Sequence, residues 1–170
     1  MTNPLDEHMV SFNTAMAAIR VARRVLDKRA NPAANTALYG ITQETGHAML
    51  DQAEEQLSKL VAFALFAAFE RMLRDHLSAS LAPLASSTTI PAELAEKLHE
   101  YLEGGVDQWR IDSVIDLFDP PAAAQDVNNA KNARTYRNRV AHGAAPAASI
   151  PPQTAYEHLT SFLKNARLVS

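Results

Sequence analysis

Apolar side chains recur every three to four positions along most of the chain, which is the spacing of one face of an α-helix. Residues 5–29 show this spacing first, and residues 47–80 show it over a longer stretch. A break is expected at Pro32, because proline disrupts a helix interior. The apolar positions are Leu5, Met9, Phe12, Met16, Ile19, Val25 and Leu26 in the first segment, and Leu50, Leu57, Val61, Ala64, Leu65, Ala68, Met72 and Leu77 in the second.

The middle of the second segment is apolar on nearly every side. Phe63, Phe66 and Phe69 widen its apolar stripe. A helix that is apolar all round is normally buried. We therefore expect residues 61–69 to be the central and most buried element of the fold.

The second half of the chain predicts shorter helices. Residues 91–103 follow a candidate N-cap, Thr89, and begin with Pro91, a residue that is frequent in the first turn of a helix. We expect this helix to end at Gly104-Gly105, and residues 106–118 to form the next helix.

Two further helices complete the prediction. Asp119-Pro120-Pro121 supplies a cap and a first-turn proline for a helix that runs to about His142. Gly143 fits the C-terminal cap of that helix, because glycine readily adopts the left-handed conformation found there. Residues 152–168 predict the last helix.

No segment shows a convincing alternation of apolar and polar residues with a period of two, so no β-strand is predicted. No repeat and no linker divides the chain, and 170 residues are enough to bury a core. We therefore predict one all-α domain, residues 1–170, folded as a bundle of five to six helices.

Composition narrows the function classes. The formal net charge is −3, so the whole protein is no general polyanion binder, and contact with nucleic acid requires a local basic surface. The absence of cysteine excludes disulfides, thiolate zinc sites and cysteine nucleophiles. The longest apolar run, residues 60–69, is far shorter than the roughly 20 residues that span a bilayer, and residues 1–10 lack a signal-peptide pattern. We expect a cytoplasmic protein without a membrane segment.

Two Glu-x-x-His pairs match the ligand spacing of di-iron helix bundles. Glu44 and His47 form the first pair, but Glu44 stands at a predicted helix start. Glu96 and His99 form the second pair, in a charged run that is typical of a solvated face. We therefore predict neither a metal site nor a cofactor.

The predicted helix that ends at His142 carries a basic cluster. Its cations are Lys131, Arg134, Arg137 and Arg139, and no acid stands among them. In a chain with net negative charge, this predicts a local basic surface, and arginine binds phosphate through its planar fork of donors. The alternative interpretation is an ordinary solvated helix face.

His142 follows at the end of the same helix. A histidine there suits proton transfer near neutral pH, and the simpler alternative is a histidine that only caps the helix. On an ideal helix Asn138 and His142 lie about 40° apart, whereas Arg137 and His142 lie about 140° apart. If this is a site, we expect a second chain to complete it.

The stretch RNRVAHG, residues 137–143, resembles the R-x4-6-H signature of HEPN domains, with a polar residue directly after the arginine. The stretch FERMLRDHL, residues 69–77, is similar to the central helix of many such domains, and the order of the helices also fits. The resemblance implies a helical bundle that dimerises through the motif helix. It also implies that Arg137 and His142 are the catalytic pair, with Asn138 as the supporting polar residue.

Many HEPN proteins are metal-independent ribonucleases in toxin–antitoxin, phage-defence or RNA-processing systems, and others are inactive binding modules. The resemblance therefore implies an endoribonuclease that cleaves RNA by transesterification as a homodimer, with an antitoxin or another protein as a further partner. Lys131, Arg134 and Arg139 are then expected to bind the nucleic acid. Glu70 is expected to orient a motif arginine, unless it forms the alternative pair with Arg74, one turn away. Two alternatives to the enzyme remain open: a non-catalytic HEPN-like module that binds protein or nucleic acid, and a plain helical interaction domain.

Overall fold

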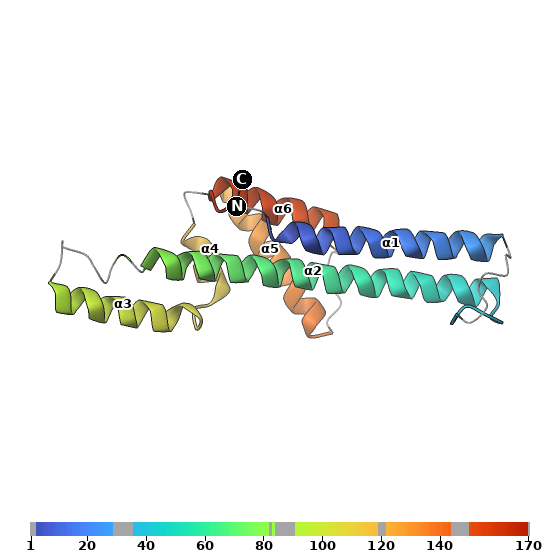
Figure 1. The fold of residues 1–170 in the computed structure, drawn as a ribbon, viewed down its shortest axis with the longest axis horizontal. Helices are drawn as coiled ribbons and strands as arrows, with labels where there is room; N and C mark the ends of the chain where they lie inside the picture. The colour runs from blue at the N-terminus through green and yellow to red at the C-terminus, as the bar shows by residue number, and fades with distance from the viewer. Residues whose placement is uncertain are drawn as a thin grey trace.

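A computed structural model describes residues 3–28, 36–81, 83, 91–118, 122–143 and 150–169. These residues form helices and no strand, which confirms the predicted all-α class (Figure 1). None of the described helices is both long and apolar enough to cross a membrane. The helices are α1 (Leu5–Asp27), α2 (Gln43–Leu81), α3 (Ala92–Val106), α4 (Ile111–Asp116), α5 (Ala124–Ala141) and α6 (Pro152–Asn165).

The long helices α1 and α2 lie side by side and run in opposite directions (Figure 1). The first half of α2 packs on α1, whereas α3 lies along the C-terminal part of α2 (Figure 1). Helices α4, α5 and α6 gather around the middle of α2. There α5 crosses α2, and the C-terminal end of α5 projects beyond it (Figure 1).

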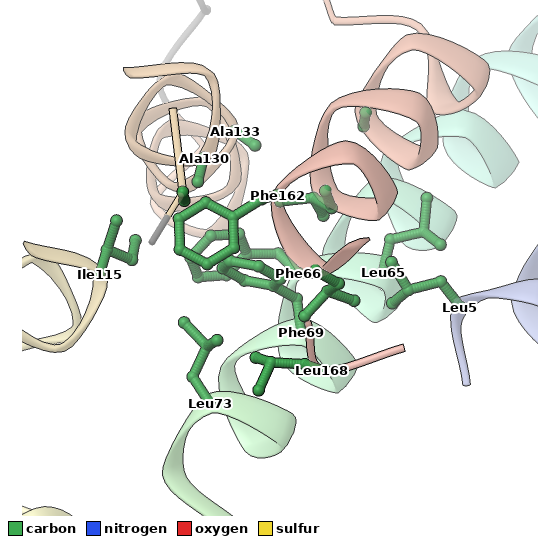
Figure 2. Close-up of a cluster of buried hydrophobic side chains, with 14 of the residues drawn as sticks. Leu5, Leu65, Phe66, Phe69, Leu73, Ile115, Ala130, Ala133, Phe162 and Leu168 are labelled. Carbon is green, nitrogen blue, oxygen red and sulfur yellow. The ribbon is translucent and has the colours of Figure 1, made fainter. Parts of the chain in front are cut away.

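The core lies where α2, α5 and α6 meet. Phe66 and Phe69 of α2 and Phe162 of α6 are 1%, 0% and 0% exposed, and the rings of Phe69 and Phe162 meet edge to face with centroids 5.2 Å apart (Figure 2). Helix α5 contributes the small buried residues Ala130 and Ala133 at this point (Figure 2). Small side chains let the backbone of α5 come close to the aromatic cluster, so the fold uses them to place this helix.

Phe63 corrects the prediction that the whole apolar segment is buried. This ring is 37% exposed, although Phe66 follows three residues later and is enclosed. Three residues correspond to about 60° around a helix, and six to about 120°. Phe63 therefore faces away from Phe69 and α6, and it lies at the surface.

The glycines Gly104 and Gly105 do not end α3, as the sequence predicted, because the helix continues to Val106. The chain then turns back, and the Trp109 amide donates to the Gly105 carbonyl at 3.0 Å. A Cβ atom at Gly105 would lie 2.9 Å from Nε1 of Trp109. Gly105 thus makes room for the indole ring inside the last turn. Pro91 stands at the N-cap rather than in the first turn, and Thr89 lies outside the described residues.

The helix predicted over residues 106–118 is shorter in the structure. Only α4 remains of it, because Arg110 adopts an extended conformation with φ −61° and ψ 132° and interrupts the helix. Its apolar residues Val114 and Ile115 are nevertheless fully buried. The apolar pattern therefore predicted burial better than it predicted the helix boundary.

The remaining predicted helices have shifted ends. Helix α2 begins at Gln43, before the predicted start, and α6 ends at Asn165, before the predicted end. Helix α5 begins at Ala124, and the predicted cap at residues 119–121 lies outside the described residues.

Arg74 of α2 holds the end of α3 in place. Its guanidinium donates to the carbonyl of Val106 and, through Nη2, to the carbonyl of Trp109 at 3.0 Å. The last carbonyls of a helix lack partners within the helix, so the partly buried Arg74 satisfies that of Val106. Nη2 also lies 2.8 Å from Oε1 of Glu70.

Two side-chain contacts attach the start of α1 to α6. The Tyr156 hydroxyl donates to Oδ1 of Asp6 at 2.7 Å, and Nδ2 of Asn3 donates to Oγ1 of Thr160 at 3.0 Å. The hydrogen bond to Asp6, with a smaller effect of burial, raises the pKa of Tyr156 above its ordinary value.

Candidate functional site

The end of α5 has the predicted cap. His142 occupies the C-cap position, and its amide donates to the Asn138 carbonyl at 3.1 Å. Gly143 follows with φ +65°, and its amide donates to the Val140 carbonyl at 3.2 Å. A positive φ favours glycine over residues with a Cβ atom, so Gly143 confirms the predicted cap. The cap fixes the backbone that carries the imidazole.

His142 and Arg139 form the open part of this end. Both side chains are exposed, and neither makes a side-chain hydrogen bond or an ion pair within the described part of the chain. Residues three apart are neighbours on a helix surface. The end of α5 therefore presents an imidazole and a guanidinium side by side, without a carboxylate from the described residues to neutralise them.

Arg137 lies against α2 instead. Its Cζ stands 4.6 Å from the centroid of the Phe63 ring, and its Nη1 donates to Oδ1 of Asn138 at 2.9 Å. Its Nε is shielded from solvent and has no hydrogen-bond partner among the described residues. The structure thus brings Arg137, Asn138 and Phe63 together, and the ring fixes the direction of the guanidinium.

Lys131 and Arg134, in the middle of α5, both have carboxylate partners. Lys131 pairs with Asp116, and Arg134 pairs with Asp112, both on α4. These aspartates balance the two cations, so the uncompensated positive charge lies at Arg137 and Arg139. The basic surface is smaller than residues 131–139 predict by themselves. Asp112 and Asp116 are spaced i,i+4 on α4, and Lys131 and Arg134 are spaced i,i+3 on α5. This matched spacing could have predicted the two ion pairs from the sequence.

Glu70 forms the alternative pair. Its carboxylate binds Arg74, one turn later on α2, and the structure gives it no contact with a motif arginine within the described residues. The physical reason is proximity, because i,i+4 side chains meet on one helix face while Arg137 packs on Phe63. Glu70 therefore supports the junction of α2 and α3.

The two Glu-x-x-His pairs do not converge on a common point in the structure. Nε2 of His47 lies 3.0 Å from Asp27, and Nε2 of His99 lies 3.1 Å from Glu103. Among the described residues, no three histidine, aspartate or glutamate side chains gather in a way that could hold a metal ion.

A hollow lies elsewhere on the surface, between the end of α3 and the turn before α4. Its lining residues are Tyr101, Gly104, Gly105, Gln108 and Trp109. None of them is a histidine or a carboxylate, so this hollow lacks the groups for acid–base chemistry near neutral pH. The end of α5 is the better candidate for such chemistry.

The candidate site therefore consists of His142, Arg139, Arg137 and Asn138, with Phe63 as a neighbour that the sequence reasoning assigned to the core. It offers proton transfer through the imidazole and two positive charges for an anion. Comparisons with protein-family models, with curated proteins and with solved structures find no match to this chain. The HEPN resemblance rests on residues 69–77 and 137–143 and on the order of the helices.

Proposed function

We propose that this chain is a metal-independent endoribonuclease of the HEPN type, which acts as a homodimer in a toxin–antitoxin, phage-defence or RNA-processing role. One observation carries the proposal. The end of α5 presents an exposed histidine beside Arg139, with Arg137 near, and no carboxylate among the described residues neutralises these arginines. An RNA phosphate is an anion that such a surface attracts.

The reaction in this proposal is a transesterification. A base removes the proton of the RNA 2′-hydroxyl, the 2′-oxygen forms a bond to phosphorus, and the bond from phosphorus to the 5′-oxygen breaks. An acid gives a proton to the leaving 5′-oxygen, so the products end in a 2′,3′-cyclic phosphate and a 5′-hydroxyl. His142 acts in proton transfer, which contributes roughly 10²–10⁴-fold, and the arginines stabilise the phosphorane charge.

A second copy supplies the other proton-transfer group. Two His142 side chains, one from each chain, divide the roles of base and acid across a shared cleft. The projection of the end of α5 beyond α2 supports this arrangement, because it leaves the motif accessible to another chain (Figure 1). RNA is the substrate class because this chemistry needs the 2′-hydroxyl.

A non-catalytic HEPN-like module is the second candidate, and an observation favours it. Phe63, which contacts Arg137, is 37% exposed, and Leu60, three residues earlier on α2, is 67% exposed. Exposed apolar side chains next to cations are also suited to a protein partner. This candidate binds its partner through the same surface and cleaves nothing.

The proposal is tested with protein freed of bound partners and kept in EDTA, incubated with RNA. We expect cleavage by the wild type and a loss of at least about 100-fold in His142→Ala, with an unchanged circular dichroism spectrum. Arg71→Ala serves as the arginine control for Arg137→Ala, because the Arg71 side chain is 85% exposed on α2. Cleavage that survives both His142→Ala and Arg137→Ala would remove the site assignment, and binding without cleavage would favour the second candidate.

Mixed dimers test the shared site. Wild-type and His142→Ala chains are mixed in varying proportions at constant total concentration and allowed to exchange. If both His142 side chains serve one cleft, activity follows the square of the wild-type fraction. A linear dependence would mean that each chain works alone, which contradicts the two-chain mechanism.

A further inference from the structure

Phe63 is the aromatic residue of α2 that the core leaves at the surface. Phe66 and Phe69 are enclosed, whereas Phe63 and Leu60 lie on the outer face of the same helix. Single exposed apolar residues are common and carry no meaning by themselves. The significance of Phe63 therefore depends on the group that touches it.

That group is the guanidinium of Arg137. Its Cζ lies 4.6 Å from the ring centroid, within the range of a cation–π contact. Asn138 accepts a hydrogen bond from Nη1, so the guanidinium is held at two points. The ring thus positions the cation over part of its own face, and the exposed remainder of Phe63 and of the half-buried Arg137 is open to a further planar group.

The donors of Arg137 are not all used by the protein. Nε is shielded from solvent and unpartnered among the described residues. A ligand cannot reach this covered atom, but Arg137 as a whole is only half-buried, and Asn138 takes one hydrogen bond, from Nη1, so further Nη donors are left for an acceptor. Bases and phosphates both carry suitable acceptors, and Arg139 and His142 follow Arg137 by two and five residues at the end of α5.

We propose that Phe63 and Arg137 form a stacking surface for an unpaired nucleobase of the RNA, whose backbone extends to Arg139 at the end of the same helix. Aromatic rings and arginine guanidinium groups beside a cationic surface are the usual means of binding single-stranded nucleic acid. This inference rests on the proposed function, and it narrows the substrate to RNA with unpaired bases. A base inside a duplex is stacked on its neighbours and is not available to the ring.

Binding is measured by fluorescence anisotropy with a short 2′-O-methyl RNA, which keeps the bases and phosphates but lacks the hydroxyl that reacts. Phe63→Leu removes the ring and keeps an apolar side chain. We expect this variant to bind single-stranded RNA roughly 5- to 100-fold more weakly than the wild type, the loss reported for one stacked base. Phe63→Tyr keeps the ring and should retain the wild-type affinity within about 3-fold.

Two controls separate stacking from a general surface effect. Leu60→Ala removes the neighbouring exposed apolar side chain and should leave RNA affinity within about 2-fold of the wild type. A fully abasic oligonucleotide of equal length keeps the phosphates and removes the bases, so Phe63→Leu should bind it as the wild type does. A loss of the same size on the abasic strand would mean that Phe63 acts only by supporting the fold, which overturns the inference.

The other outcomes are also decisive. If the wild type cleaves RNA and Phe63→Leu binds it normally, the stacking surface is refuted while the proposed function stands. If the wild type neither binds nor cleaves RNA, both proposals fail. If Phe63→Leu leaves RNA binding intact but lowers the dimer fraction in sedimentation, a second chain covers the ring and the inference is wrong.

Discussion

Lys131 and Arg134, in the middle of α5, each reach an aspartate of α4, whereas Arg139 and His142, at the end of the same helix, reach no carboxylate in the described part of the chain. The residue types are similar, and the surroundings differ. In the middle of the helix, α4 neutralises the cations and holds α5 in the bundle. At its end, the helix projects beyond α2 (Figure 1), and the charges there have no carboxylate partner among the described residues. Position in the fold, more than the density of basic residues, therefore marks the candidate site.

Packing also distinguishes the two regions, and it gives the largest expected effect. Ala130 is fully buried in the core, whereas Ala141, in the last turn, is exposed. Ala130→Leu should lower the free energy of unfolding by about 1–3 kcal/mol, because extra methylene groups do not fit a packed core. Ala141→Leu should change it by less than about 0.5 kcal/mol. Urea denaturation measures the free energy of unfolding of both variants. Equal losses would mean that the two positions do not differ in packing.

The cap at the end of α5 gives the next effect. Gly143→Ala should lower the free energy of unfolding by about 1–2 kcal/mol, because a Cβ atom is unfavourable at φ +65°. Gly104→Ala is the matched control in α3, where a Cβ atom meets nothing within 4 Å. That change should raise stability by roughly 0.5–1 kcal/mol, the difference between glycine and alanine inside a helix. If both variants changed the free energy of unfolding in the same direction, the left-handed glycine cap at Gly143 would be contradicted.

Charge at the two positions should differ in its effect on RNA binding. Arg139→Gln should reduce the slope of log affinity against log salt by about 0.7, the value for one phosphate contact on a single strand. Lys131→Gln should leave that slope unchanged, because Asp116 already neutralises this lysine. Titrations at several salt concentrations measure both slopes. A larger change in slope for Lys131→Gln than for Arg139→Gln would mean that the middle of α5, and not its end, contacts the phosphates.

The ion pair between α4 and α5 gives the smallest effect. A double-mutant cycle of Arg134→Gln and Asp112→Asn should show a coupling of about 0.2–1 kcal/mol in the free energy of unfolding, since both side chains are partly solvated. A cycle of Arg139→Gln and Asp112→Asn should show none. Coupling in the second cycle would mean that α4 also neutralises the end of the helix.

The sequence predicted the helical class, the core positions of α1 and most of those of α2, and the glycine cap, because these depend on local spacing. It misplaced the helix ends near Gly104 and Arg110, where the packing of Trp109 on Gly105 and the extended Arg110 decide the boundary. Such contacts form only in the folded chain, so the spacing of apolar residues along the sequence does not predict them.

The candidate site was predicted only in part for the same reason. Residues 137–142 were found because they are contiguous in the chain. The partners of Arg137, Arg134 and Glu70 depend on how α2, α4 and α5 meet, so the contact of Arg137 with Phe63 could not be read from a segment that is apolar on nearly every side.

The most direct test of the central claim is a map of the RNA-binding surface by NMR. Isotope-labelled protein in EDTA is titrated with a short, uncleavable single-stranded 2′-O-methyl RNA, and amide shifts are followed along the chain. We predict that the largest shifts cluster at residues 137–143 at the end of α5 and at Phe63 of α2. Shifts centred on residues 126–134, or on α3, or no shifts at saturating RNA, would contradict the assignment of the functional site to the end of α5.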